Sequence, residues 1–454
     1  MSFYDSKRRG WRRSWSFVAA TIGATLGLGN LWKFSYLAGD NGGAAFILAY
    51  LICTLLVAMP VMVAEVVLGS RGRANPVASM ETLSLEAGVS QWWQVIGWLG
   101  CISGLLVLSY YAVIAGWSFA YVLKMISGEF IAGSAQLAGD NFNALLESPS
   151  LLLQWQSAYL VLLFLIAMAG VRRGLGGIAR FLVPLLLLLL LALVVYSSRV
   201  GDFSAAIEFL FATDLSVLTA QVWLKALGHA FFTLTIGVGV MMAYGAYAPD
   251  KRSITKMVGI AVLVDILVSI LAGLAIFPLV FSLNMAPSMG PGLMFVAMPY
   301  GFGNMLYGNY FGALFFLVVS LTAVVSGVAL LEPAVAWLKE RFGWWRQLAV
   351  PVVVLLVWAM GWVTILSFNR LQDVRLLGFS IFGLLDFLTA NILLPVGGCL
   401  IAIFVGWRMR REVLRDELYV ESGKIFSLWY WLLRYIAAPG VVLVFGWTLS
   451  QALL

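Results

Sequence analysis

Long apolar stretches, separated by short polar or basic segments, follow one another along almost the whole chain. A helix needs about 20 predominantly apolar residues to cross the hydrocarbon core of a bilayer. Eleven stretches are long enough, at 15–37, 42–69, 91–124, 152–170, 178–198, 220–247, 254–284, 306–338, 345–367, 376–407 and 428–452. The uncharged segment 287–305, which contains Gly and Pro, predicts a re-entrant or capping hairpin between two spans. The pattern therefore predicts an all-α polytopic membrane protein.

Composition and charge predict how the chain is oriented in the membrane. Of the 454 residues, 62% are hydrophobic and only 11% are charged, against about 25% charged in soluble domains. Most of the 28 Lys and Arg residues fall in the segments that would face the cytoplasm if the N-terminus did. The positive-inside rule then predicts a membrane protein with its N-terminus inside and its C-terminus outside. The formal charge of +7 is a topology signal, and no nucleic-acid partner is expected.

Two spans carry the same glycine pattern near their centres. The first contains Thr25-x-Gly27-x-Gly29 and the sixth contains Thr235-x-Gly237-x-Gly239. Glycine disfavours helix by about 1 kcal/mol relative to alanine, so both are expected break points. Close helix packing is the alternative for one such run. Two runs five spans apart, hence of opposite topology, favour an inverted repeat whose discontinuous helices bind an anionic group and a cation.

Ionisable residues inside spans need partners or a water-filled cavity, because each costs at least about 2.5–3.5 kcal/mol at the bilayer centre. They are Lys33, Glu65, Asp265, Glu332 and Asp386. Lys33 and Asp386 could form a gate-like ion pair, although Lys33 could also snorkel from a helix end. Asp265, together with Thr25, Asn30 and Thr233, offers the hard oxygen ligands that suit an alkali cation.

Enzyme chemistry has no support in the sequence. There is no Ser/His/Asp nucleophilic arrangement, no P-loop and no dinucleotide fingerprint. His229 is the only histidine, and a structural role is its first interpretation.

Several motifs resemble the signatures of the neurotransmitter:sodium symporter family, in its bacterial eleven-span branch. They are GLGNLWKF at 27–34, NGGAAF at 41–46, YY at 110–111, FFTL at 231–234, AGLAIFP at 272–278 and LLDF at 384–387. The resemblance covers nearly the whole chain, and the bacterial branch implies the cytoplasmic (inner) membrane of a bacterium. It implies the leucine-transporter fold, with two inverted five-helix repeats, an eleventh helix, discontinuous first and sixth spans, and sodium-driven alternating access. The implied units are 1–200, 201–410 with the hairpin 287–305, and 411–454.

The resemblance also implies two sodium sites. The first would use Thr25, Asn30, Thr233 and Asp265. The second would use Gly23, Leu26, Thr322 and Ser326. Here the chain departs from the family, because Val325 stands where a Thr or Asp oxygen usually completes the second site. One or two sodium ions are therefore expected.

The implied substrate site would hold a carboxylate at Tyr111 and at the amides near Leu28 and Gly29. The full predicted set is Ala24, Thr25, Gly27, Leu28, Gly29, Val107, Tyr111, Phe232, Thr233, Thr235, Val238, Ser326 and Leu330. Ala24 is neutral where monoamine carriers place an aspartate. The resemblance therefore implies import of a neutral, apolar amino acid.

The resemblance implies two gates and no chloride. The outer gate would pair Lys33 with Asp386. The inner gate would pair Arg8 with Glu340, helped by Trp11, Tyr247 and Glu332. Chloride in relatives touches positions matching Tyr50, His229, Thr233 and Ser269; Asp265 brings its own negative charge, so chloride independence is expected.

Two other functions stay open at this stage. A proton-driven carrier of a small amino acid or related zwitterion, such as a β-amino acid or taurine, would bind its substrate equally when sodium is replaced. Protonation of Asp265 or His229 could in addition support proton counter-transport. A non-transporting solute receptor of the same fold would bind without flux. The expected partners are the small-molecule substrate and the lipid bilayer, with the protein a monomer or a weak homo-oligomer.

Overall fold

The computed structural model describes residues 14–212, 214–249, 253–287, 292–443 and 446. The first half contains α1 (Ser14–Thr25), η1 (Gly29–Lys33), α2 (Phe34–Asp40), α3 (Ala44–Cys53), η2 (Thr54–Ala58), α4 (Met59–Gly72), α5 (Pro76–Ala87), η3 (Gln91–Gln94), α6 (Val95–Ile126), α7 (Ala135–Leu146), α8 (Pro149–Met168), η4 (Val171–Leu175) and α9 (Gly176–Val200). The second half contains α10 (Phe203–Phe211), η5 (Leu215–Val217), α11 (Ala220–Thr233), α12 (Val240–Gly245), α13 (Ile254–Ser282), η6 (Leu293–Ala297), α14 (Met298–Gly303), α15 (Gly308–Phe342), α16 (Arg346–Leu366), α17 (Ile381–Phe387), η7 (Leu388–Leu393), α18 (Leu394–Ile403), η8 (Phe404–Arg408), α19 (Arg411–Glu417), α20 (Gly423–Leu432) and η9 (Leu433–Ala437).

Membrane-spanning helices dominate the fold. Within the described residues, nine continuous helices are long and apolar enough to cross a bilayer, and each coincides with a predicted span. The two predicted spans that are not continuous, 15–37 and 220–247, are those with the repeated glycine pattern. The prediction of an all-α polytopic protein with discontinuous first and sixth spans is confirmed.

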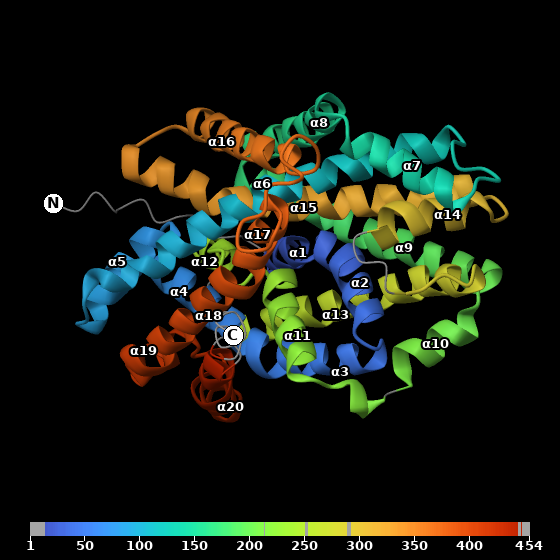
Figure 1. The fold of residues 1–454 in the computed structure, drawn as a ribbon. Coiled ribbons are helices and arrows are strands. Elements are labelled where there is room, and N and C mark those ends of the chain that lie inside the picture. The colour runs from blue at the N-terminus through green and yellow to red at the C-terminus, as the bar shows by residue number, and fades with distance from the viewer. Residues whose placement is uncertain (1–13, 213, 250–252, 288–291, 444–445, 447–454) are drawn as a thin grey trace.

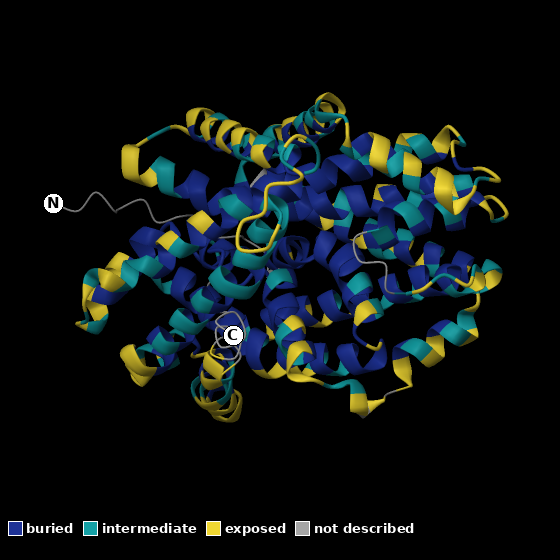
Figure 2. Cartoon of the chain, viewed as in Figure 1, coloured by how far each residue is buried: buried dark blue, intermediate teal, exposed yellow. Residues whose placement is uncertain are grey.

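Long helices run side by side along the molecule (Figure 1). The spans of α6, α13 and α15 are mostly buried and form the inside of the bundle, whereas α8, α9 and α16 are less buried and lie towards its outside. The inner helices are mostly buried, whereas the outer ones carry exposed positions (Figure 2). Many of those exposed positions are large apolar residues, such as Leu165, Phe181 and Leu188. Such an apolar exterior is what a lipid-facing surface requires.

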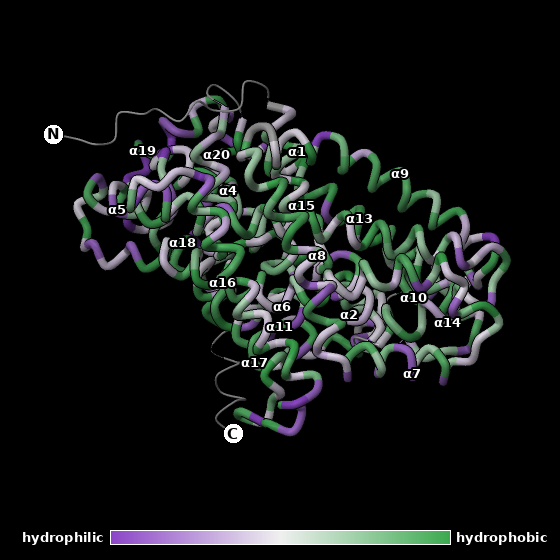
Figure 3. The backbone as a smooth tube through the Cα atoms, turned by 90° about the horizontal axis from the view of Figure 1, so that it is seen from above, coloured by the Kyte–Doolittle hydropathy of each residue, from purple (hydrophilic) through white to green (hydrophobic). Residues whose placement is uncertain are grey.

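Polar positions gather at the ends of the bundle, as the hydropathy colouring shows (Figure 3). At one end lie α5, α19 and the start of α20; at the other lie α7, α10 and α14. The described part of the predicted hairpin 287–305 forms η6 and α14, which pack against α7 and α15. The bundle therefore has two polar caps around an apolar band, and the two helix breaks lie between the caps.

Candidate functional site

The first and sixth spans both lose helical structure near the middle of the bundle. α1 ends at Thr25 and helical structure resumes after Gly27. α11 ends at Thr233 and α12 begins at Val240. Because the last carbonyls of a helix and the first amides of the next have no partner within the helix, each break exposes backbone donors and acceptors inside the protein.

Glycine serves the two breaks for different reasons. At Gly27 the constraint is space, since a Cβ there would lie 2.8 Å from Tyr111 Oη and 2.9 Å from Ser326 Oγ. In the sixth span the constraint is backbone conformation, because Gly237 and Gly239 have φ of +79° and +72°, values that favour glycine. The same sequence pattern thus produces both breaks through two different constraints.

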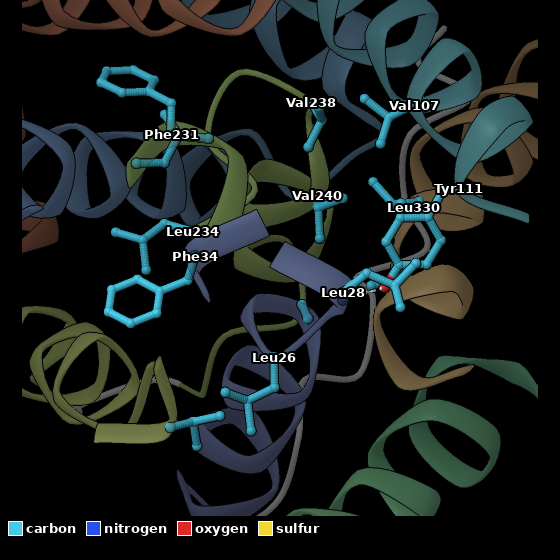
Figure 4. Packing of buried hydrophobic residues seen from close by; sticks show 14 of the residues in the cluster. Leu26, Leu28, Phe34, Val107, Tyr111, Phe231, Leu234, Val238, Val240 and Leu330 are labelled. Atoms are coloured by element: carbon cyan, nitrogen blue, oxygen red, sulfur yellow. Dashed lines mark hydrogen bonds between the residues drawn. The ribbon is translucent and has the colours of Figure 1, made fainter. Parts of the chain in front are cut away.

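A narrow pocket lies between the two breaks. It is lined by Ala24, Thr25, Gly27, Gly29, Val107, Tyr111, Phe232, Thr233, Thr235, Val238, Ser326, Leu330 and Leu394. All the predicted substrate residues except Leu28 are in this set, and Leu394 of α18 is an addition that the sequence did not indicate. Figure 4 shows Val107, Val238, Tyr111 and Leu330, together with Leu28, beside the breaks. The lining is largely apolar, and its polar side chains are those of Thr25, Tyr111, Thr233, Thr235 and Ser326.

Tyr111 connects the first break to α15. Its Oη accepts a hydrogen bond from the Leu28 amide at 3.0 Å and bonds to Ser326 Oγ. Leu28 thus faces the pocket through its backbone, although its side chain is not part of the lining. A hydroxyl and backbone amides gathered at a helix break form a polar end suited to a carboxylate.

Asp265 is the centre of a fully buried polar network. Its Oδ1 accepts from Asn30 Nδ2 at 2.7 Å and its Oδ2 accepts from the Tyr50 hydroxyl at 2.8 Å. Asn30 Nδ2 also donates to Ser269 Oγ at 3.0 Å. A buried carboxylate is costly unless it is paired or coordinates a cation, and the network supplies only neutral partners.

The predicted first sodium ligands thus meet only in part. Asp265 and Asn30 are in direct contact, but Asn30 Oδ1 accepts from the Gly27 amide at 3.0 Å and turns away from the carboxylate. Thr25 and Thr233 hydroxyls donate to Ile22 and Ala230 carbonyls, at 3.0 and 3.4 Å. Coordination through the Asn30 oxygen requires its amide to turn over, because a cation takes oxygen ligands here.

The predicted second sodium region has a different character. Gly23 lies against Val325, whose Cγ1 occupies the space that a Cβ on residue 23 would need. Thr322 Oγ1 donates to the Val319 carbonyl at 2.7 Å, and Ser326 Oγ is bonded to Tyr111. An apolar side chain therefore packs against Gly23 in the predicted second sodium region.

His229 lies next to the Asp265 network, inside a cage of aromatic rings. Its ring centroid is 5.2 Å from that of Tyr50 and 5.9 Å from those of Phe34 and Phe46. Among the residues that the structure describes, neither ring nitrogen has a hydrogen-bond partner. The packing supports the structural interpretation of this histidine.

The predicted outer gate residues meet above the pocket. Lys33 Nζ lies 2.6 Å from Asp386 Oδ1 and 4.6 Å from the centroid of the Phe232 ring. Side-chain exposure is 8% for Lys33 and 28% for Asp386, so the pair is largely shielded from water. Phe232 lines the pocket on one side and contacts the ion pair on the other.

The predicted inner gate is only partly visible, since Arg8 and Trp11 lie outside the described residues. Glu340 accepts hydrogen bonds from Asn75 N and Nδ2, both at 2.7 Å. Glu332 forms a bidentate pair with Arg346, with N–O distances of 2.8 and 3.2 Å. Tyr247 lies in the turn that follows α12. The sequence did not indicate that Arg346 pairs with Glu332.

Glu65 is a further residue whose part the sequence did not indicate. It is fully buried, and its carboxylate accepts from the amides of Gly237 at 3.0 Å and Met242 at 3.4 Å. The Gly237 amide belongs to the break in the sixth span and the Met242 amide to the first turn of α12, so α4 supplies the acceptor for both. The available signal was a buried acid inside a span, without an indication of its partner.

Comparison with known proteins gives a consistent result. A family model described as the sodium:neurotransmitter symporter family matches residues 8–136 and 146–452. An uncharacterized sodium-dependent transporter, YhdH, from Bacillus subtilis is 35% identical over 438 residues, which cover 96% of both chains. An uncharacterized sodium-dependent transporter from Haemophilus influenzae is 27% identical over 452 residues, 98% of both chains. The crystal structure of MhsT in complex with L-phenylalanine matches with a TM-score of 0.90 and 36% identity, over 96% of this chain and 99% of that one.

Proposed function

Because the chain belongs to the sodium:neurotransmitter symporter family, we propose that it imports a neutral amino acid with an apolar side chain, coupled to sodium entry. The family and the leucine-transporter fold predicted from the sequence are confirmed. The proposal adds the substrate class, the ion and the direction. It places the N-terminus in the cytoplasm and the C-terminus outside.

The observation that carries the proposal is the asymmetry of the pocket between the two helix breaks. One end has the Leu28 amide and the hydroxyls of Tyr111 and Ser326, which suit a substrate carboxylate. Most of the remaining lining is apolar, with Ala24, Val107 and Leu330 among its residues. The hydroxyls of the three threonines in the lining, Thr25, Thr233 and Thr235, donate to backbone carbonyls. A substrate with a carboxylate at one end and an apolar side chain at the other satisfies both.

The nature of the side chain is supported by the relative solved with bound ligand. MhsT was crystallised with L-phenylalanine and shares 36% of its sequence with this chain. In this chain Leu394 and Val238 line the pocket and contribute apolar surface. Aromatic and branched aliphatic amino acids are therefore the proposed substrates.

Sodium coupling is proposed at Asp265. A carboxylate with only neutral partners supplies a negative charge that a monovalent cation can balance. Because this negative charge is part of the protein, the proposed cycle needs no chloride. One sodium ion that moves down a tenfold concentration gradient and a membrane potential of 100 mV releases about 3.7 kcal/mol. This energy is enough to accumulate the substrate several hundredfold.

The test combines binding and flux. We expect leucine, phenylalanine or another apolar amino acid to raise the unfolding temperature of the purified protein in sodium chloride and equally in sodium gluconate, but not in potassium chloride. In proteoliposomes, an inward sodium gradient should then drive uptake of the same compound. Shifts in potassium would favour a proton-driven carrier, and binding without flux would favour a receptor.

A further inference from the structure

A hollow lies at the polar end of the molecule, between α19 and the first turn of α20. Its lining consists of Arg411, Glu412, Arg415, Gly423, Phe426 and Ser427. The two helices lie side by side in both views of the molecule (Figures 1 and 3). None of these residues belongs to the pocket between the helix breaks or to either gate.

Aromatic rings hold the two guanidinium groups of the hollow. Arg411 lies 5.7 Å from the centroid of Phe426 and 5.6 Å from that of Tyr430. Arg415 lies 5.2 Å from the same Phe426 ring. Such contacts hold a guanidinium over the face of a ring and do not use its N–H donors. Phe426 is itself buried, so the platform under both cations is rigid.

The donors of these arginines are not used within the protein. In the described part of the chain neither Arg411 nor Arg415 forms an ion pair, and Arg415 Nη1 is buried without a hydrogen-bond partner. A buried guanidinium nitrogen without an acceptor is costly. The geometry therefore calls for an acceptor from outside the chain.

The surrounding charges favour an anion. Gly423 opens the ten-residue helix α20, so the positive end of the helix dipole faces the hollow. Glu412 is the one carboxylate in the lining, against two guanidinium groups. Two neighbouring acids are engaged elsewhere: Glu417 accepts from Ser70, and Glu421 accepts from Ser253 Oγ at 2.7 Å and the Thr255 amide at 3.1 Å.

The level of the hollow relative to the membrane points to a lipid as the ligand. α20 opens the final span, Gly423–Leu443, and its exposed side chains just beyond Gly423 include Ile425, Leu428 and Trp431, at 46%, 59% and 50% exposure. In a bilayer these residues face lipid, and a tryptophan among them is typical of the membrane interface. The first turn of α20 then lies at the level of the lipid phosphates.

We propose that this hollow binds the phosphate headgroup of an anionic phospholipid. Arg411 and Arg415 donate to its oxygens in the forked geometry that suits phosphate, and the first turn of α20 contributes its dipole. The apolar face of α20 accommodates the acyl chains.

The test uses the full-length protein purified in detergent, with phosphatidylglycerol titrated into the micelles and binding followed by native mass spectrometry and unfolding temperature. Phosphatidylcholine and water-soluble glycerol 3-phosphate are the comparison ligands. We expect phosphatidylglycerol to bind tightest and to raise the unfolding temperature most. The double variant R411Q/R415Q should weaken its binding by about 25-fold, since each basic residue near anionic lipid contributes about a factor of five.

The matched control is R408Q/R410Q, which removes two exposed arginines from the same link but outside the hollow. We expect it to weaken phosphatidylglycerol binding by less than about fivefold, because longer-range charge alone is lost. An equal loss in both double variants would overturn the proposal in favour of diffuse surface charge. Saturation by glycerol 3-phosphate at the same concentration would overturn the lipid assignment.

A conservative pair covers the case in which R411Q/R415Q does not fold. R411K/R415K keeps the charge and loses the forked donors, so several-fold weaker phosphatidylglycerol binding is expected. Unchanged binding in the lysine pair would overturn the proposed guanidinium contacts.

Discussion

The two regions predicted to bind sodium differ sharply in chemistry, although both lie beside the break in the first span. Around Asp265 a buried carboxylate, an amide and two hydroxyls meet within hydrogen-bonding distance. Around Gly23 a methyl group of Val325 fills the corresponding space. A common backbone break is therefore not sufficient for a cation site, since the side chains that approach it decide whether oxygen ligands are available.

The largest expected effect comes from neutralising the first region. Asp265→Asn keeps the shape but removes the charge that balances the cation, and hydrogen bonds to charged groups are worth about 1.5–3 kcal/mol. We expect sodium affinity, measured by the sodium dependence of the unfolding temperature, to fall by about 10- to 100-fold. Chloride should then recover part of it, whereas in the unaltered protein chloride and gluconate should be equivalent.

A smaller effect is expected at the edge of the same region. Tyr50→Phe removes the hydroxyl that donates to Asp265 Oδ2 at 2.8 Å and leaves the ring in place against His229. We expect sodium affinity to change by up to about tenfold, since a single charged hydrogen bond is altered. Tyr121→Phe is the matched control, because it deletes a buried hydroxyl far from Asp265. A change of equal size in the control would contradict a specific role for Tyr50.

The smallest effect should come from adding an oxygen to the second region. Val325→Thr is nearly isosteric and offers a hydroxyl beside Gly23. We expect sodium to bind about two- to tenfold more tightly, because one added interaction contributes about as much free energy as one hydrogen bond. The sodium dependence of uptake should also become steeper. Val325→Ala serves as the control, since it makes space without an oxygen. An equal gain in the alanine variant would show that space, and not the oxygen, limits this region.

Much of the fold followed from the sequence because its determinants are local. The lengths of the apolar stretches predicted the membrane-spanning helices. The repeated Thr-x-Gly-x-Gly pattern predicted both breaks, since α1 ends at Thr25 and α11 ends at Thr233. The family resemblance supplied nearly all of the pocket lining. The roles of the predicted ligands and gate residues stay predictions.

What the sequence missed depends on contacts between distant elements. Leu394 reaches the pocket from α18, a span without a motif near its centre. The carboxylate of Glu65 accepts hydrogen bonds from backbone amides, and such donors cannot be recognised from residue types in the sequence. Arg346 meets Glu332 because the chain reverses at Gly343, with φ of +67°, and brings the start of α16 back along α15.

The length of α15 has a mechanical consequence. Its 35 residues extend over about 52 Å, while the hydrocarbon core is about 30 Å thick. Typical tilts of about 20° do not absorb that difference, so the helix projects well past the membrane boundary. Pro333 lies within it and cannot donate to the carbonyl one turn earlier. The helix therefore lacks one backbone hydrogen bond beside Pro333, and the ion pair between Glu332 and Arg346 links α15 to α16 at that same point.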